Sequence, residues 1–359
     1  MVDFAGWSLP VQYSDFGIID SCLHTRSKAS LFDVSHMGQL QIHGRDREAF
    51  IESLTVGDVR ALREGESRLS VFTNVHGGII DDTVITKRRD NIQVVLNAGC
   101  VDKDMAHIEK AAEAFIGDVS LQLDRKLSLI ALQGPEAAAV LRPLVPELDL
   151  EHIPFMSSVD AMIAGVAGCS LSRCGYTGED GFELSIPGGQ AANDIAETIL
   201  LNNSVRLAGL GARDTLRIEA GLCLYGSDID ETTTPVEAGL AWTVSKRRRA
   251  EGDFPGASVI LRQLAEGVQR KRVGMTILSG PPARHDNPLF VPESPGTNPV
   301  GKTTSGTFSP SLGRAVAIGY VSTDHASPGV NLMVEVRSKV NPVVVTKMPF
   351  VKANYYRGK

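Results

Sequence analysis

The sequence predicts a folded chain of mixed secondary structure, α+β or α/β, that ends in a strand-rich unit. Helical and strand-like patterns interleave up to about residue 250, as both mixed classes require. After Phe254-Pro255-Gly256 the pattern changes to short strand-like segments between Pro- and Gly-rich turns, which favours a small C-terminal β-barrel or sandwich. The 359 residues exceed what one hydrophobic core usually serves, so two or three packed units are expected.

Strand patterns dominate the first hundred residues. Residues 38–42 alternate polar and apolar side chains before a turn at His43-Gly44, which predicts a half-buried strand. Further strands are predicted at residues 69–73, 79–86 and 92–96. The turn signal His76-Gly77-Gly78 separates the first two of these, so a hairpin or meander is expected.

Helices and strands then alternate to the end of the mixed region. A helix ending near residue 117 is predicted by apolar residues that recur on one face, namely Val101, Met105, Ile108, Ala112 and Phe115. A second helix is predicted to begin at Gly134-Pro135, with proline in its first turn. Other predicted helices cover residues 190–201, 213–222 and 259–264, and other predicted strands cover residues 128–132, 170–174, 182–186, 273–278, 315–321 and 332–336.

Composition excludes several classes of protein. Hydrophobic residues make up 43% and charged residues 22%, as in folded globular chains rather than disordered or fibrous ones. The net charge of −6 is scattered along the chain, which does not favour a nucleic-acid partner. The basic run from Lys246 to Arg249 is interpreted as a solvated loop, with docking to an acidic partner as the alternative.

The cysteines and the apolar segments carry no special signal. An odd count of five cysteines without a C-x-x-C pair predicts neither a disulfide framework nor a metal site, but reduced thiols in or near the core. The five are Cys22, Cys100, Cys169, Cys174 and Cys223. No apolar stretch approaches the roughly 18–20 residues needed to cross a bilayer. Met1 leads straight into a folded-looking segment, without a charged, apolar leader.

Two adjacent carboxylates, Asp81 and Asp82, follow a Gly-Gly turn within an apolar strand. Neighbours in a strand point to opposite faces, so at most one of them is expected to face a shared pocket. A polar turn whose carboxylates accept from backbone donors is one interpretation. The other is a carboxylate that guides proton transfer or stabilises developing positive charge on a ligand. The pattern does not choose between the two residues.

Three further segments combine glycine with charged or aromatic residues. Residues 173–183 join two predicted strands through a Gly-rich turn, either as a hairpin with acidic, solvated tips or as a site. Residues 209–220 form a loop that enters a helix, where Arg213 and Arg217 could pair with Asp214 or Glu219; the spacing does not match a phosphate-binding loop. His36 has no evident metal partner or nucleophile elbow, so we interpret it as a hydrogen-bonded structural histidine.

Taken together and in order, these motifs strongly resemble the glycine cleavage T-protein family. The similarity covers essentially the whole chain, in segments 1–7, 32–37, 77–82, 132–135, 175–183 and 211–214, and in Thr304-Ser305-Gly306 with Ser309-Pro310. The resemblance implies an α+β fold, a three-domain cloverleaf around a central folate site. Residues 1–255 would hold two intertwined α+β domains that bind folate, and residues 256–359 the C-terminal β-barrel.

By motif position, the resemblance implies that Asp82 is the catalytic aspartate. Glu183 matches the acidic residue that holds the pterin, and Arg213 the arginine of the same site. The other implied folate-binding residues are Tyr176, Asn97, Met37 and Trp242 at wall positions, Arg272 on the anionic side of the folate, and Tyr355 near the C-terminus. No metal ligand and no flavin is implied, and no dinucleotide fingerprint occurs. Some members carry tyrosines where this chain has Leu69 and Thr86.

The resemblance also implies an activity and partners. Members are aminomethyltransferases that move a methylene carbon from the lipoyl arm of H protein to tetrahydrofolate, releasing ammonia, alongside the other glycine cleavage components. The likeness is strongest to eukaryotic, mitochondrial members, which implies the mitochondrial matrix, with a bacterial cytoplasm as the alternative. Neither nucleic acid nor a membrane is implied as a partner. The rival functions are a non-enzymatic folate-binding module of the same fold, a folate-linked demethylase domain, and a structural scaffold.

Overall fold

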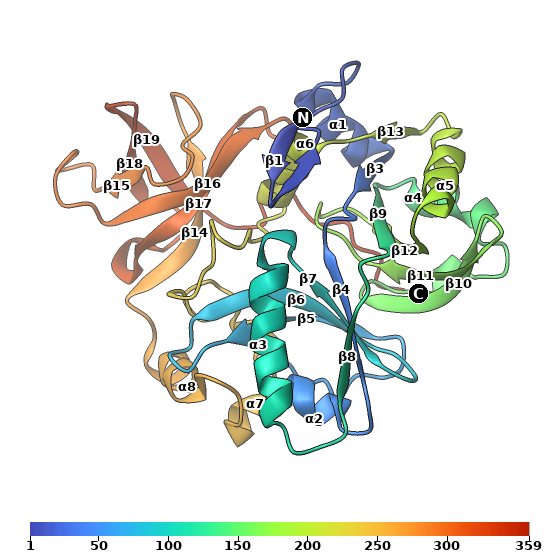
Figure 1. Ribbon diagram of the computed structural model, residues 1–359. Coiled ribbons are helices and arrows are strands. Elements are labelled where there is room, and N and C mark those ends of the chain that lie inside the picture. Colours follow the sequence, from blue (N-terminus) through green and yellow to red (C-terminus); the bar gives the residue numbers. More distant parts are fainter. Residues whose placement is uncertain (359) are drawn as a thin grey trace. The chain divides into compact units, whose positions relative to one another are not determined.

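The computed structural model of the chain describes residues 1–358 (Figure 1). Contacts divide it into two compact units, which we call the first and second unit. The first unit comprises Met1–Phe72, Asp81–Arg213 and the C-terminal residues from Asn354. The second comprises Thr73–Ile80 and Asp214–Ala353. The division falls inside strand β6 (Ile79–Lys87) and inside helix α6 (Leu210–Glu219).

One sheet of the first unit has five strands in the order β5-β6-β7-β4-β8. Besides β6, its strands are β5 (Ser67–Thr73), β7 (Ile92–Leu96), β4 (Gly38–His43) and β8 (Ser120–Leu123). Helix α3 (Val101–Ala114) packs on this sheet, where the rings of Phe72 and His107 meet edge to face at 6.4 Å. The short helix α2 (Arg47–Glu52) belongs to the same part of the chain. The four strands and the helix predicted here are confirmed, because strand alternation and helical spacing mark their buried faces.

The other sheet of the first unit has six strands in the order β10-β11-β12-β9-β3-β13. They are β10 (Ser157–Ile163), β11 (Val166–Arg173), β12 (Gly181–Pro187), β9 (Leu127–Gln133), β3 (Ala29–Asp33) and β13 (Val205–Leu207). Only the β13–β3 pair in this sheet is parallel. Helices α1 (Ile18–Ser27), α4 (Ala137–Leu141) and α5 (Gln190–Leu200) accompany it, and β1 (Val2–Phe4) pairs with β2 (Trp7–Leu9).

The six-stranded sheet carries a hydrophobic core of its own. Phe182, Leu184 and Ile186 are fully buried and line one face of β12, because alternate side chains of a strand point to the same face. Phe182, Leu184, Ile195 on α5 and Leu141 on α4 belong to one core cluster. Each large apolar side chain removed from water in this way contributes about 1.5–3 kcal/mol, which fixes the strands that present the polar residues described below.

The second unit contains a closed barrel of strands in the order β14-β17-β16-β15-β18-β19 (Figure 1). They are β14 (Arg270–Ile277), β17 (Arg314–Ser322), β16 (Gly301–Ser309), β15 (Pro288–Phe290), β18 (Asn331–Val336) and β19 (Lys339–Thr346). The expected C-terminal barrel is confirmed, and the sandwich alternative is not. Strands β15, β16 and β19 were not predicted, because polar residues, glycine and proline interrupt their alternation.

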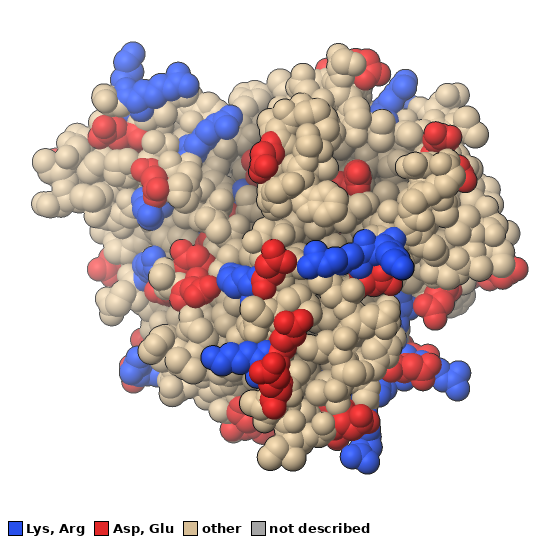
Figure 2. Space-filling view, in the orientation of Figure 1, with Lys and Arg blue, Asp and Glu red and all other residues tan. Residues whose placement is uncertain are grey.

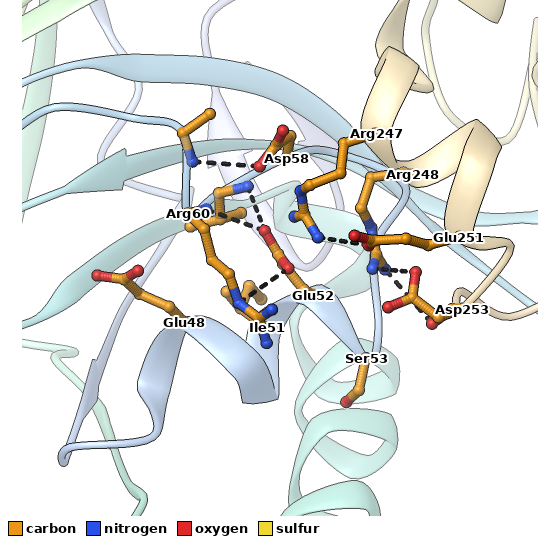
Figure 3. A network of polar contacts seen from close by, with 12 residues as sticks. Glu48, Ile51, Glu52, Ser53, Asp58, Arg60, Arg247, Arg248, Glu251 and Asp253 are labelled. Atoms are coloured by element: carbon orange, nitrogen blue, oxygen red, sulfur yellow. Dashed lines mark hydrogen bonds and ion pairs between the residues drawn. The ribbon is translucent and has the colours of Figure 1, made fainter.

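The basic run of the second unit is not the solvated loop that the sequence predicted. Residues Lys246–Glu251 form helix α7, and helix α8 (Ala257–Glu266) follows. Figure 3 shows Arg247 directed at Glu251, at 2.5 Å, and Arg248 at Asp253. The Arg248 side chain is 1% exposed. Its partner, Asp253, lies five residues later in the chain, just after the end of α7.

The surface carries charges of both signs. In the view of Figure 2, acidic and basic side chains alternate over the face that is drawn. Among residues 1–358, no helix is long and apolar enough to span a bilayer.

Candidate active site

Strand β6 places two carboxylates beside the end of β7. The antiparallel register that pairs Val84 with Val95 brings Asp82 opposite Asn97, the first residue after β7. The Asn97 side-chain amide lies 2.9 Å from Oδ1 of Asp81 and 3.0 Å from Oδ1 of Asp82, and the Asn97 backbone N–H donates to Oδ2 of Asp81. Alternation predicted opposite faces for the two carboxylates, yet both reach one amide, because Asn97 sits where the strand pair ends.

The two carboxyl groups differ in exposure and in charge state. Asp81 is fully buried, whereas Asp82 keeps part of its surface accessible. Burial, followed by the nearby Asp81 carboxylate, raises the pKa of Asp82 to about 7, from an ordinary value of about 3.9. Both residues lie within β6 and not in a turn, so the interpretation as a polar turn is wrong. An aspartate with this pKa is suited to proton transfer near neutral pH.

The Gly-rich segment after β11 is a packed loop rather than a solvated hairpin tip. Thr177 is fully buried, and its hydroxyl donates to Oε1 of Gln133 at 2.8 Å, while Nε2 of Gln133 donates to the carbonyl of Cys174 at 2.9 Å. A Cβ on Gly175 would lie 1.9 Å from the Gln133 side chain, so only glycine fits there. The buried glutamine at the end of β9 therefore fixes the loop that precedes β12.

Two ion pairs hold the acidic residues of the same loop. Asp180 forms a bidentate pair with the buried Arg173, at 2.8 and 2.5 Å. Glu179 accepts from Arg26 of α1 at 3.0 Å. Both carboxylates thus have structural partners, and of the two interpretations of this segment the hairpin with solvated acidic tips is wrong.

Glu183 on β12, Arg213 on α6 and Tyr176 of the loop come together in the first unit. The Arg213 guanidinium carbon lies 4.8 Å from the centre of the Tyr176 ring, a cation–π contact. Burial raises the pKa of Glu183, and the Arg213 charge offsets part of that rise. Glu183, Arg213 and Tyr176 remain partly accessible, so a carboxylate, a guanidinium and an aromatic ring lie together at one partly exposed place.

His36 faces the same group. Burial and the Arg213 charge lower its pKa to about 4, which keeps the ring neutral at neutral pH. The ring meets Phe4 edge to face at 5.5 Å. Among the described residues, no group hydrogen-bonds its Nδ1. One ring nitrogen of His36 is therefore buried without a partner among the described residues, and the interpretation as a hydrogen-bonded structural histidine stays a prediction.

One hydrogen bond joins the two sheets close to both groups. Ser185 of β12 donates to Gln39 of β4 at 2.5 Å, and β4 pairs with β7, with Gln39 opposite Val95. Glu183 lies two residues from this contact along β12, a rise of about 7 Å, and on the same face as Ser185. Asn97 lies two residues from Val95 along the other strand.

The C-terminal residues pack on the same unit. The Asn354 backbone N–H donates to the carbonyl of Gly178, and the Asn354 side chain donates to Glu179. The Tyr355 ring stacks on Phe155 with centroids 4.0 Å apart, and burial raises its pKa. The end of the chain is thereby fixed on the loop that carries Tyr176.

The remaining predicted residues lie elsewhere in the two units. Met37 follows His36 in the first unit and is partly buried. Trp242 and Arg272 belong to the second unit, where Trp242 is 63% exposed and Arg272 donates to the carbonyls of Ala238 and Gly221. No group of three or more His, Cys, Asp or Glu side chains among residues 1–358 is arranged to hold a metal ion. All five cysteines are buried, as predicted, and no disulfide joins them among residues 1–358.

Comparison with known families covers nearly the whole chain. The GCVT N-terminal domain matches residues 1–248, and the glycine cleavage T-protein C-terminal barrel domain matches residues 270–352. The chain belongs to the glycine cleavage T-protein family.

Relatives in this family are similar over nearly the whole of this chain. The mitochondrial aminomethyltransferase of Gallus gallus is 53% identical, covering 100% of this chain and 91% of the relative. That of Pisum sativum is 50% identical, covering 99% and 87%. A crystal structure of the glycine cleavage system aminomethyltransferase T from Bartonella henselae superposes with a TM-score of 0.92 at 38% identity, covering 99% of this chain and 95% of that one.

The glycine cleavage T-protein fold brings some residues to the site that sequence reasoning did not select. Gln133 and His36 lie in matched segments, but their contacts depend on partners far along the chain. Asp104 is different, because it interrupts the apolar face of α3 between Val101 and Ile108, at helical spacing. That acidic residue on an apolar face was a usable signal, and the side chain is 1% exposed.

Proposed function

We propose that Asp82, held beside Asp81 by Asn97, drives the proton movements of aminomethyl transfer to tetrahydrofolate. Family membership and full-length similarity make this chain an aminomethyltransferase of the glycine cleavage system. The observation that carries the assignment of Asp82 is its placement in the first half of β6 beside the end of β7, where it is partly accessible and has a pKa raised to about 7. A group with that pKa accepts and returns protons at neutral pH.

The proposed reaction requires such a group because protons change places. The methylene carbon arrives between sulfur and nitrogen on the lipoyl arm of H protein. Two carbon–nitrogen bonds to tetrahydrofolate form, the carbon–nitrogen bond to the amine and the carbon–sulfur bond break, and ammonia and the dihydrolipoyl thiol leave. The two protons lost from the folate nitrogens balance those gained by the amine and the thiolate. In its ionised form, Asp82 also stabilises the cationic character of the methylene carbon as it is attacked.

We propose that three of these residues hold the pterin of the folate. The Glu183 carboxylate can accept two parallel hydrogen bonds from the 2-amino group and the neighbouring ring N–H. Arg213 balances that charge, and Tyr176 supplies aromatic surface. We propose further folate contacts from Asn97, Met37, Trp242 and Tyr355 at the walls, and from Arg272 on the anionic side of the folate.

Glu183→Gln is expected to weaken folate binding. A neutral amide oxygen replaces a charged acceptor of two hydrogen bonds, and a bond to a charged group is worth about 1.5–3 kcal/mol, so Kd should rise about 10- to 150-fold. Fluorescence titration with tetrahydrofolate measures the change. Glu266→Gln, at an exposed position on α8, is the matched control. An unchanged Kd in Glu183→Gln would remove Glu183 from the site.

Turnover is expected to depend on the charge of Asp82. Because the pKa of Asp82 is raised to about 7, the carboxylate predominates above that pH, and its fraction falls about tenfold per pH unit below it. The kcat measured from pH 5.5 to 8.5 should therefore show an acid limb centred near the Asp82 pKa. A flat profile over this range would show that the ionisation of Asp82 does not limit turnover.

The decisive experiment measures both products. Ammonia and 5,10-methylenetetrahydrofolate should form from aminomethylated H protein only when tetrahydrofolate is present. Folate binding without either product would instead support a non-enzymatic folate-binding module. The same assay tests the proposed partner, because H protein lacking the lipoyl arm should give no product.

We also propose a location and a division of labour. The relatives named above are mitochondrial in Gallus gallus and Pisum sativum, which supports the mitochondrial matrix for this chain; a bacterial cytoplasm is the alternative, and cell fractionation distinguishes them. As other glycine cleavage components act with the family, they are the proposed further partners. The folate-binding region is proposed to end near residue 255, which limited proteolysis between α7 and β14 would test.

A further inference from the structure

Asp104 is a buried acid that the proposed function does not use. It lies on α3, on the helix face that packs against the five-stranded sheet, and it is 1% exposed. Apart from a second carboxyl group, no group among the described residues hydrogen-bonds either of its carboxyl oxygens. Burying an ionised carboxylate whose two oxygens have no donor costs free energy. We therefore expect a proton to be bound at this carboxyl group.

The neighbouring carboxyl group of Asp81 indicates where this proton lies. The Asp81 carboxyl group lies within hydrogen-bond reach of Asp104, and its own oxygens already accept from the side chain and backbone of Asn97. Two carboxylates so close in a buried place cannot both ionise, and one proton between them converts repulsion into a short O–H···O hydrogen bond.

We infer that Asp104 is a positioning residue that shares one proton with Asp81 beneath Asp82, so that the pair carries a single negative charge. The consequence for catalysis rests on the proposed function of Asp82, whereas the shared proton itself does not. The single charge raises the affinity of Asp82 for its own proton, and the bound proton keeps Asp81 oriented toward Asn97, which in turn holds Asp82.

The surrounding groups agree with this charge state. Burial, then the charge of Asp81 and a hydrogen bond to it, raises the pKa of Asp104 to about 10, and Lys103 offsets only part of the rise. Burial together with Asp81 and Asp104 raises the pKa of the Cys100 thiol, which stays neutral. Asp82, Lys103 and Cys100 are thus the titratable groups that face the pair, and titration belongs to the pair rather than to one residue.

The first test measures the proton without using activity. A carboxyl group with a pKa of about 10 when folded and about 3.9 when unfolded binds a proton on folding throughout neutral pH. Its contribution to stability is therefore complete below about pH 4 and falls as pH rises towards 10. In Asp104→Asn, the amide still donates to Asp81 but the titrating group is gone. Urea unfolding from pH 6 to 8.5 should show a folding constant that falls about tenfold more per pH unit in the parent chain than in the variant.

The outcomes of this test are distinct. Equal pH slopes for the parent and Asp104→Asn would overturn the inference. Asp102→Asn, on the same helix but exposed, should keep the parent slope. If Asp104→Asn does not fold, the infrared spectrum of the Asp82→Asn/Glu183→Gln double variant at about pH 8 is measured instead. This variant lacks the two other acids whose pKa is raised, so the Asp81–Asp104 pair is the carboxylic acid expected to be protonated at that pH. A missing carboxylic-acid carbonyl band would overturn the inference.

The second test asks whether the charge on the pair is single. Asp81→Asn removes that charge, so the acid limb of the kcat profile should move to lower pH. Asp104→Asn removes only a neutral group, so the limb should stay in place. An equal shift in both variants would mean that Asp104 is ionised and would overturn the inference. If Asp82→Asn is fully active, the proposed catalytic role fails, but the unfolding test still decides whether the proton is shared.

Discussion

Asp82→Asn is expected to lower kcat by about 10²- to 10⁴-fold, the range over which a positioned acid or base contributes. The amide retains the shape of the side chain and its contact with Asn97, which lies 3.0 Å from Oδ1 of Asp82. It can neither bind the migrating proton nor carry the negative charge that stabilises the methylene carbon. Steady-state release of ammonia from aminomethylated H protein measures the loss.

Folate binding should survive this change. The groups proposed to hold the pterin are Glu183, Arg213 and Tyr176, and the amide in place of Asp82 leaves their contacts intact. The Kd for tetrahydrofolate should therefore stay within about twofold of the parent, a difference under 0.5 kcal/mol. Asp90→Asn, exposed beyond the end of β6, is the matched control and should leave both quantities unchanged. Normal turnover in Asp82→Asn would exclude Asp82 as the catalytic residue.

The pH dependence of the residual activity of Asp82→Asn tests which group titrates in the acid limb. If Asp82 is the group behind the acid limb, the variant should lose that limb as well as most of its rate. A variant that is slow but keeps the limb would assign the titration to another group, with Glu183 the first candidate because burial raises its pKa too.

Sequence patterns predicted most of the strands that carry this site, but not the choice between Asp81 and Asp82. Alternation in β6 marked both as polar residues in an apolar strand, and the pairing that distinguishes them comes from Asn97, fifteen residues beyond Asp82. The raised pKa of Asp82 depends on burial and on the charge of Asp81. Neither can be read from one segment, so the assignment came from resemblance.

Packing of distant segments also explains the expectations that failed. The loop at residues 175–181 contains the glycines and acids of a solvated turn, yet Gln133, Arg173 and Arg26 satisfy it from three other elements. By contrast, the acid at position 104 was visible in the helical pattern. A charged residue on an apolar face is a local signal, whereas the partners of a loop are not.

In the second unit, Thr304 and Ser305 of the motif Thr304-Ser305-Gly306 hydrogen-bond a buried ion pair, which no local sequence pattern predicted. Arg217 of α6 is buried, pairs with Asp214 at 2.9 Å and with the buried Asp228, and donates to the Ser305 hydroxyl at 2.7 Å. The Thr304 hydroxyl donates to the other oxygen of Asp228 at 2.5 Å. The expected pairing of Arg217 with Asp214 is confirmed, but the stronger interaction is with Asp228, which lies beyond the helix.

Arg217→Met is expected to lower the free energy of unfolding by about 3–5 kcal/mol, because removal of one member of a buried ion pair leaves the other charge uncompensated. Asp228 would keep the hydroxyl of Thr304 and the backbone N–H of Leu224, at 3.0 Å, but no guanidinium. Urea-induced unfolding followed by circular dichroism measures the loss. Arg314→Met, at an exposed position on β17, should leave the midpoint unchanged.

The double variant Arg217→Met/Asp228→Leu separates charge from packing. If the cost of Arg217→Met arises from the stranded Asp228 carboxylate, removing that carboxylate as well should restore stability in part, since a buried pair replaced by apolar side chains is often neutral. If the guanidinium matters chiefly through its bonds to Ser305 and to the Leu222 carbonyl, the double variant should be at least as unstable as the single one. The Thr304 hydroxyl would then keep only the Ile318 carbonyl, at 3.3 Å. The Leu224 backbone N–H would lose its Asp228 acceptor, which would add to the loss.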